Sequence, residues 1–164
     1  MYYRLWTILF LFISYSIFSE TKSREPDFTL KNLRGESVSL SMFSQKIVLI
    51  EWYSFWCDEC REVFHDIKSF FHELNKVLPE KSFQLLAINI DDKEEKEIAE
   101  FVEFEQIFYT VLLDPEGTTA DVFDIKGLPY FAIIGKQGRV EKTFKGFDKT
   151  TKEAIRKTLL SLIE

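Results

Sequence analysis

The chain of 164 residues lacks several features that would point to other classes of protein. It has two cysteines, so no second Cys-x-x-Cys pair exists to complete a four-thiolate zinc site. Its net charge is −6 and it has no basic run, which argues against a nucleic-acid partner because phosphates call for clustered cations. Repeats, low-complexity tracts and Pro/Gly/Ser-rich linkers are also absent. We therefore expect one globular domain over residues 24–164.

An apolar run long enough to span a membrane is lacking as well. The uncharged run from Leu5 to Phe18 has about fourteen residues, whereas an untilted spanning helix needs roughly 20. Arg4 precedes the run and the small Ser19 ends it. Residues 1–19 are therefore predicted to be a secretory signal peptide, with a retained membrane tether through residues 5–18 as the alternative. Both alternatives imply an exported protein, periplasmic or anchored facing the periplasm, where disulfides persist.

The pattern of apolar and polar residues predicts strands in the rest of the chain. Alternation on both sides of Gly35 predicts an N-terminal β-hairpin over residues 26–43. Near-continuous apolar runs predict buried central strands over 46–54 and 83–90. The remaining strands are expected over 109–114, 129–135 and 139–146.

Helical spacing of apolar residues alternates with these strands. A long helix is predicted from the cysteines to Pro79, and an acidic helix from Asp91. The acidic helix is expected to have these residues on its inner side: Ile98, Phe101, Val102 and Phe104. Shorter helices are expected over 118–125 and 150–163. Strands that alternate with helices imply an α/β fold, in which helices flank a central mixed β-sheet on both faces.

The segment SFWCDEC, Ser54 to Cys60, holds both cysteines. Cys57 falls where the predicted central strand ends and the long helix begins, so its sulfur is expected at a helix N-terminus. Unpaired backbone N–H groups and the helix dipole favour a thiolate there, and the thiolate is the attacking form of cysteine. Cys60 lies one turn further along the same face. The pattern predicts that Cys57 attacks a substrate disulfide and that Cys60 resolves the mixed disulfide, leaving a redox-active internal bond.

Three other uses of the cysteine pair are open. A structural staple is disfavoured because stabilisation by a disulfide grows with the loop it closes, and this loop is very short. A metal site needs convergent ligands, whereas His72 would lie about 22 Å along the helix axis from Cys57. His65 and His72 are therefore expected on the helix surface. Two cysteines without a joint role are the third alternative. The favoured prediction is thiol chemistry with no metal and no cofactor.

Several segments together resemble a known family. The chain is similar to the exported thioredoxin-fold thiol-disulfide oxidoreductases of the TlpA/ResA type, within the redoxin and AhpC/TSA superfamily, in the order and spacing of PDFTL, VLIEWYSFWCDECRE, FQLLAINID, FVEFEQIFYTVLLDPEG and GLPYFAIIGKQGRV. The resemblance implies a thioredoxin fold and an enzyme that reduces protein disulfides. It also implies a membrane thiol carrier as electron donor and, as in many members, substrates on the way to cytochrome c maturation.

The resemblance assigns roles to residues outside the pair. Trp56 matches a tryptophan that shields the site, and Pro129 matches a proline that faces the two sulfurs and follows a cis peptide bond. Leu128 is then implied to pair its backbone with an extended substrate strand. Glu59 stands where relatives usually have proline, and its negative charge works against thiolate formation. These substrate-binding roles are expectations from the family.

Glu51 lies inside the predicted central strand, at the position where thioredoxin itself has a buried acid. A carboxyl group among apolar side chains is expected to have a raised pKa and to act as a proton acceptor. We hypothesise that Glu51 takes the proton of Cys60 during resolution. A structural or partly exposed carboxylate is the alternative.

Two other functions stay open from the sequence. A peroxidase of the peroxiredoxin type shares the opening PDFTL, and Ser54 with Cys57 resembles the Thr/Ser-x-x-Cys of those enzymes. However, Ile50 stands where they have proline. A thiol metallochaperone would instead carry copper or zinc through the pair without turnover. An exported Cys-x-x-Cys pair fits exchange with protein thiols and disulfides better than either alternative.

Overall fold

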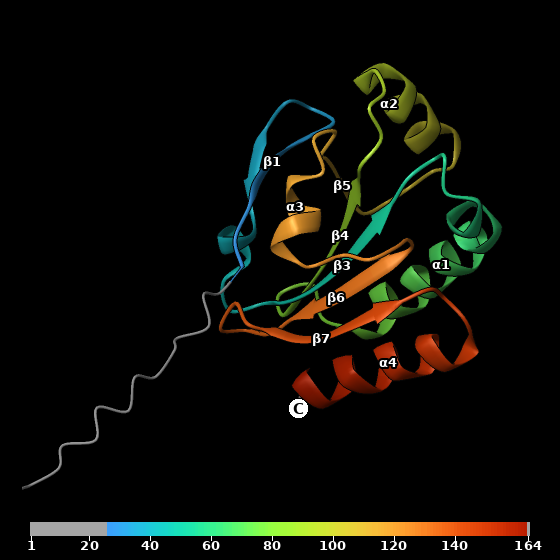
Figure 1. Cartoon of the computed structure of the whole chain (residues 1–164). Coiled ribbons are helices and arrows are strands. Elements are labelled where there is room, and N and C mark those ends of the chain that lie inside the picture. The colour runs from blue at the N-terminus through green and yellow to red at the C-terminus, as the bar shows by residue number, and fades with distance from the viewer. Residues whose placement is uncertain (1–25, 164) are drawn as a thin grey trace, which may run out of the picture.

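The computed structural model describes residues 26–163, so the predicted signal segment 1–19 lies outside the described residues. Seven strands form one sheet in the order β2-β1-β5-β4-β3-β6-β7 (Figure 1). The strands are β1 (Thr29–Asn32), β2 (Ser37–Ser39), β3 (Ile47–Tyr53), β4 (Phe83–Asn89), β5 (Thr110–Leu113), β6 (Tyr130–Ile134) and β7 (Val140–Lys145). The helices are η1 (Leu40–Phe43), α1 (Asp58–Val77), α2 (Glu95–Phe104), α3 (Thr118–Val122) and α4 (Lys149–Ile163). Within residues 26–163, none of the helices is long and apolar enough to cross a membrane.

Strand β3 lies inside the sheet between β4 and β6, and all seven of its residues are buried. It runs parallel to β4 and antiparallel to β6, while β1 pairs antiparallel with both β2 and β5. The predicted mixed sheet and its N-terminal hairpin are therefore confirmed. Because β3 and β4 are parallel, both end at the same edge of the sheet. The segments that follow them, which contain Cys57 and Asp91, meet at that edge.

The two faces of the sheet pack against different helices. One face packs against α1 and α4 through Ile67, Phe70, Phe71, Leu74, Ile155 and Leu159. On the other face, Trp52 packs on Phe123 with ring centroids 4.7 Å apart. The Trp52 Nε1–H donates to Thr119 Oγ1 at 2.8 Å, and the Thr119 hydroxyl donates to Asp114 at 2.5 Å. This chain of paired buried groups holds α3 against β3.

Helix α2 differs from its prediction in where it begins and in the burial of Phe104. It begins at Glu95 and not at Asp91, because Asp91 is buried and accepts hydrogen bonds from the loop before Cys57. The side chain of Phe104 is 83% exposed and does not lie on the inner side. At 3.6 residues per turn, Phe104 lies about 240° around the helix from the buried Ile98. The prediction for Phe104 was therefore wrong for a reason that the helical period explains.

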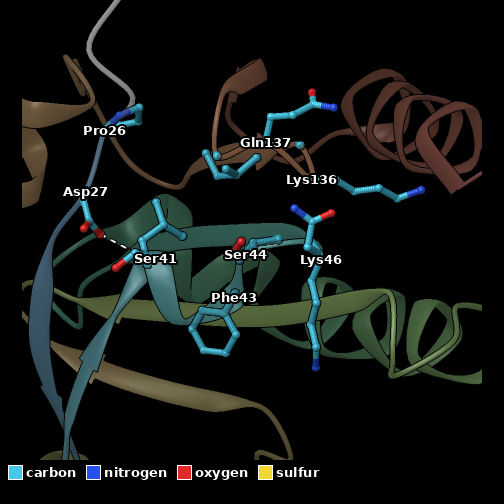
Figure 2. A pocket seen from close by; sticks show the side chains of 14 residues that line it. Pro26, Asp27, Ser41, Phe43, Ser44, Lys46, Lys136 and Gln137 are labelled. Atoms are coloured by element: carbon cyan, nitrogen blue, oxygen red, sulfur yellow. Dashed lines mark hydrogen bonds between the residues drawn. The ribbon is translucent and has the colours of Figure 1, made fainter.

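A cavity of about 390 Å³ hollows the edge of the sheet where β3 begins (Figure 2). Two of its charged groups have partners in the protein: Asp27 accepts a hydrogen bond from the Ser41 N–H at 3.1 Å. Lys46 donates to the Glu80 carbonyl at 3.1 Å, and its side chain extends away from Lys136 in Figure 2. This edge lies about 20 Å, the length of β3, from the edge that carries the cysteines. The reactive groups of the chain are therefore at the other end of the strand.

Candidate active site

Cys57 is the N-cap residue of α1 and follows the loop that leaves β3, as the sequence predicts. Its Sγ accepts a hydrogen bond from the Cys60 backbone N–H at 3.1 Å. The two cysteines form a disulfide, with their Cα atoms 5.2 Å apart and exposed fractions of 8% and 5%. A helix N–H directed at the Cys57 sulfur favours negative charge there. Once the bond is reduced, Cys57 is therefore the sulfur placed to become a thiolate.

The two acids between the cysteines have different surroundings. Asp58 forms an ion pair with Arg61, whose guanidinium also donates to the Phe55 carbonyl at 2.6 Å. Glu59 is exposed, and within residues 26–163 no ion pair compensates its charge. The negative charge expected to oppose a thiolate at Cys57 therefore comes from Glu59 more than from Asp58.

The loop before Cys57 is held by Asp91, a residue that the sequence analysis did not single out. The buried Asp91 carboxylate accepts from the Ser54 hydroxyl at 2.9 Å, from the Phe55 N–H at 2.9 Å and from the Asn89 amide at 2.7 Å. This network joins the end of β4 to the loop that carries Trp56, whose side chain is 65% exposed. The segment NIDD places polar residues directly after a buried strand, and this pattern could have pointed to the Asp91 network. The Ser54 hydroxyl group therefore donates its hydrogen bond to the Asp91 carboxylate.

Pro129 lies beside the first turns of α1. The Leu128–Pro129 peptide bond is cis, as the resemblance implies, and both residues are buried. Pro129 shares a cavity of about 300 Å³ with residues of α1 and of the segment after β7: Glu59, Glu62, Val63, Lys145, Gly146, Phe147 and Asp148. The fold therefore brings Leu128 and Pro129 to the helix turn that contains the disulfide.

Glu51 and Cys60 line one cavity of about 220 Å³. Glu51 is 4% exposed, and within the described chain no hydrogen bond or ion pair reaches its carboxyl group. Burial raises the pKa of Glu51 from 4.5 to about 8, as the sequence predicts in direction. A buried acid that titrates near neutral pH and shares a cavity with Cys60 is suited to exchange a proton with that cysteine.

The two histidines lie on the surface of α1. His65 is exposed at the rim of the Glu51 cavity, and His72 stacks on Phe108 with ring centroids 4.2 Å apart. Across residues 26–163, no three side chains among His, Cys, Asp and Glu are grouped so that they could hold a metal ion.

Comparison with known proteins agrees with this geometry. The AhpC/TSA family model matches residues 22–143. The sporulation thiol-disulfide oxidoreductase A of Bacillus subtilis (strain 168) is 25% identical over 118 residues, 71% of this chain and 68% of the relative. The thiol-disulfide oxidoreductase ResA of Geobacillus thermodenitrificans (strain NG80-2) is 25% identical over 140 residues, 85% of this chain and 76% of the relative.

Solved structures show the same architecture. The crystal structure described as a thiol:disulfide interchange protein DsbE of Chlorobium tepidum superposes with a TM-score of 0.72 and 28% identity, over 85% of this chain and 95% of that one. The exposed lipoprotein thioredoxin Etrx1 of Streptococcus pneumoniae strain TIGR4 gives a TM-score of 0.67 and 25% identity, over 83% and 99% of the two chains. The expected thioredoxin fold is confirmed. The chain belongs to the AhpC/TSA family, as a thioredoxin-fold member with the disulfide-linked cysteine pair of a thiol-disulfide oxidoreductase.

Proposed function

We propose that this chain is an exported enzyme that reduces disulfides of other proteins through Cys57 and Cys60. The observation that carries the proposal is the disulfide at the N-terminus of α1, with Cys60 in the same cavity as the buried Glu51. In that arrangement one sulfur is activated by the helix and the other has a proton acceptor within its cavity. These are the two requirements of a dithiol that turns over.

The reaction begins with both cysteines reduced. The Cys57 thiolate attacks one sulfur of the substrate disulfide, and the other substrate sulfur leaves as a thiolate. Cys60 then gives its proton to Glu51 and attacks the Cys57 sulfur. The bond between Cys57 and the substrate breaks, the second substrate thiol is released, and the enzyme is left with the Cys57–Cys60 disulfide. Because the pKa of Glu51 is about 8, its carboxylate fraction, and with it the rate of resolution, rises with pH through the neutral range.

The substrate is proposed to lie across the surface formed by Trp56, Leu128 and Pro129. The exposed Trp56 side chain and the buried Leu128–Pro129 segment flank the first turn of α1 on the loops after β3 and before β6. An extended substrate strand that pairs with the Leu128 backbone would present its disulfide to Cys57. This geometry favours protein substrates, since a strand supplies the backbone groups that such pairing needs.

The source of electrons and the location follow from the resemblance to TlpA and ResA proteins. We place the enzyme outside the cytoplasm, with a membrane thiol carrier as its reductant and cytochrome c maturation as the process it serves. Cell fractionation and N-terminal sequencing of the mature protein test the location. A full-length protein recovered from the cytoplasm would contradict it.

The central test compares Cys57→Ser and Cys60→Ser in reduction of a protein disulfide such as insulin. Cys57→Ser is expected to abolish activity, because no thiolate remains at the helix N-terminus. Cys60→Ser is expected to accumulate mixed disulfides on Cys57, and mass spectrometry of the trapped complexes then identifies the partners. Full activity of Cys57→Ser would overturn the proposal.

Two assays separate the alternative functions. Peroxide consumption by the reduced protein, faster than its reduction of protein disulfides, would indicate a peroxiredoxin-like peroxidase. Stoichiometric copper or zinc binding without disulfide reduction would indicate a thiol metallochaperone. The expected result is protein-disulfide reduction that requires both cysteines.

A further inference from the structure

The hydroxyl group of Tyr53 is buried without a hydrogen-bond partner. Tyr53 is 6% exposed, and its Oη is the one side-chain oxygen or nitrogen of residues 26–163 that is fully enclosed by the protein and left unpaired. The Asn89 side chain lies near this hydroxyl and acts to lower the Tyr53 pKa, but the hydrogen bonds of good geometry that it forms go to Asp91: its amide donates at 2.7 Å and its carbonyl oxygen accepts from the Asp91 N–H at 3.1 Å. Buried polar groups in native proteins are nearly always paired. An exception beside the reactive cysteines therefore calls for a role.

Tyr53 lines the same cavity as Glu51 and Cys60. Three phenylalanines form the apolar part of the remaining wall, and polar residues complete it: Phe55, Phe64 and Phe101, with Ser54, Arg61, His65 and Glu105. Phe101 packs on Phe55 and Phe64 with centroids 4.7 and 5.2 Å apart, so the three rings form one apolar cluster. At about 220 Å³, the cavity has room for water molecules that join polar groups across it. The unpaired phenol, the unpaired carboxyl group and the resolving cysteine thus line one small cavity that opens to solvent.

We propose that Tyr53 is a positioning residue for resolution, whose hydroxyl donates a hydrogen bond to the Glu51 carboxylate across this cavity, through water, and holds it in place to receive the proton of Cys60. The proposal rests on the function proposed above and adds a residue to its second step. The proton moves from the Cys60 sulfur to Glu51, and the new Cys57–Cys60 bond forms as the bond to the substrate sulfur breaks. Glu51 later loses the proton to water at the cavity mouth, so the step needs no other reactant.

The chemistry of a phenol suits this role. Burial, and secondarily the charge of Glu51, raise the pKa of Tyr53 above its ordinary value, so the hydroxyl stays protonated and remains a donor. A donor stabilises the ionised carboxylate more than the neutral acid. Tyr53 therefore opposes the effect of burial on Glu51 and keeps part of its carboxylate available at neutral pH.

Other ionisable groups near Glu51 lie on the helices, strands and loops that surround the cavity. Most of them are paired elsewhere: Asp91 with the loop before Cys57, Arg61 with Asp58, and Glu105 with Lys68 at 2.9 Å. His65 is exposed at the rim. Tyr109 is the other tyrosine whose pKa is raised in part by the charge of Glu51. It does not line this cavity, and it packs on Phe71 with centroids 5.0 Å apart. Tyr109 is therefore the matched comparison for Tyr53.

The test measures the resolution step alone in Tyr53→Phe, which keeps the ring and removes the hydroxyl. Reduced protein is mixed with an aromatic disulfide reagent, whose first released thiol reports attack by Cys57 and whose second reports resolution by Cys60. We expect the midpoint of the pH profile of resolution to shift upward by about 0.5 to 1 unit, and resolution at pH 7 to slow about three- to tenfold. The first release is expected to stay unchanged, which also shows that the variant is folded.

Two controls separate this role from a structural one. Tyr109→Phe is expected to leave the profile in place, and Tyr53→Phe is expected to have no further effect on the profile in a Glu51→Gln background. Titration of the Glu51 carboxyl carbon by NMR in the reduced protein should show the same upward shift in Tyr53→Phe. Superimposed profiles for wild type and Tyr53→Phe, or equal shifts for the two tyrosines, would overturn the proposal. Loss of the first release in Cys57→Ser is the separate test of the redox function.

Discussion

Two buried polar regions lie near the disulfide, and they are built in opposite ways. Around Asp91, each carboxylate oxygen accepts hydrogen bonds, and the donors come from Ser54, Phe55 and Asn89. Around Glu51, the carboxyl group and the Tyr53 hydroxyl share a cavity without pairing to any protein group of the described chain. Both regions are equally deep: Asp91 is 3% exposed and Glu51 is 4% exposed.

The difference teaches how one fold combines rigidity with reactivity. Hydrogen bonds that satisfy Asp91 fix the loop that leads to Cys57, because breaking any of them leaves a buried donor unpaired. Within the described residues the Glu51 carboxyl group has no such hydrogen bonds, so it can change protonation state during the reaction. The same burial thus stabilises the loop at Asp91 and tunes the acidity at Glu51.

Glu51→Gln is expected to produce the largest change. In the folded protein Glu51 titrates at about pH 8, against 4.5 as its ordinary value, so between those pH values the folded state binds more protons than the unfolded state. The free energy of unfolding therefore falls as pH rises from about 5 to 8, and the variant, which stays neutral, avoids this loss. At pH 8.5 it should be more stable than wild type by up to about 4 kcal/mol in urea denaturation of the oxidised protein.

The control is Glu103→Gln, at an exposed position of α2, which should keep the wild-type pH dependence. Stability curves for wild type and Glu51→Gln that stay parallel from pH 5 to 8.5 would contradict the buried, unpaired state of Glu51. The contrast between a hydrogen-bonded Asp91 and an unpaired Glu51 would then be wrong.

Asp91→Ala is expected to have the next largest effect, in the opposite direction. It leaves the Ser54 hydroxyl, the Phe55 N–H and the Asn89 amide without their acceptor, and should lower the free energy of unfolding by about 3 kcal/mol at pH 7. The measurement is urea denaturation. The neighbouring Asp92 is exposed, so Asp92→Ala should change stability by less than about 0.5 kcal/mol. Equal effects at the two positions would show that the network around Asp91 does not hold the loop.

Phe104→Ser is expected to have the smallest effect. Its side chain is 83% exposed, so the free energy of unfolding should change by less than about 0.5 kcal/mol. Ile98, on the buried side of the same helix, is 2% exposed, and Ile98→Ala should cost about 2 to 4 kcal/mol. Chemical denaturation of both variants checks the contrast, and a large loss for Phe104→Ser would restore the orientation that the sequence had suggested.

The order of elements could be predicted because local patterns report burial directly. The continuous apolar run over 46–54 predicted a strand buried on both faces, and all residues of β3 are buried. Helical spacing after the cysteines likewise predicted α1. The start of α2 could not be predicted, because Asp91 is taken by a loop 36 residues away in sequence, a contact that no local pattern contains.

The sequence by itself determined the reactive pair, its place between a buried strand and a helix, and the presence of an acid inside that strand. Tertiary structure alone decided which groups share a cavity. The parallel pairing of β3 with β4 brings Asp91 to the Cys57 loop, and the packing of α1 and α2 encloses Glu51, Tyr53 and Cys60 together. The pKa of a buried group depends on the atoms around it, and those atoms come from segments that meet only when the chain folds.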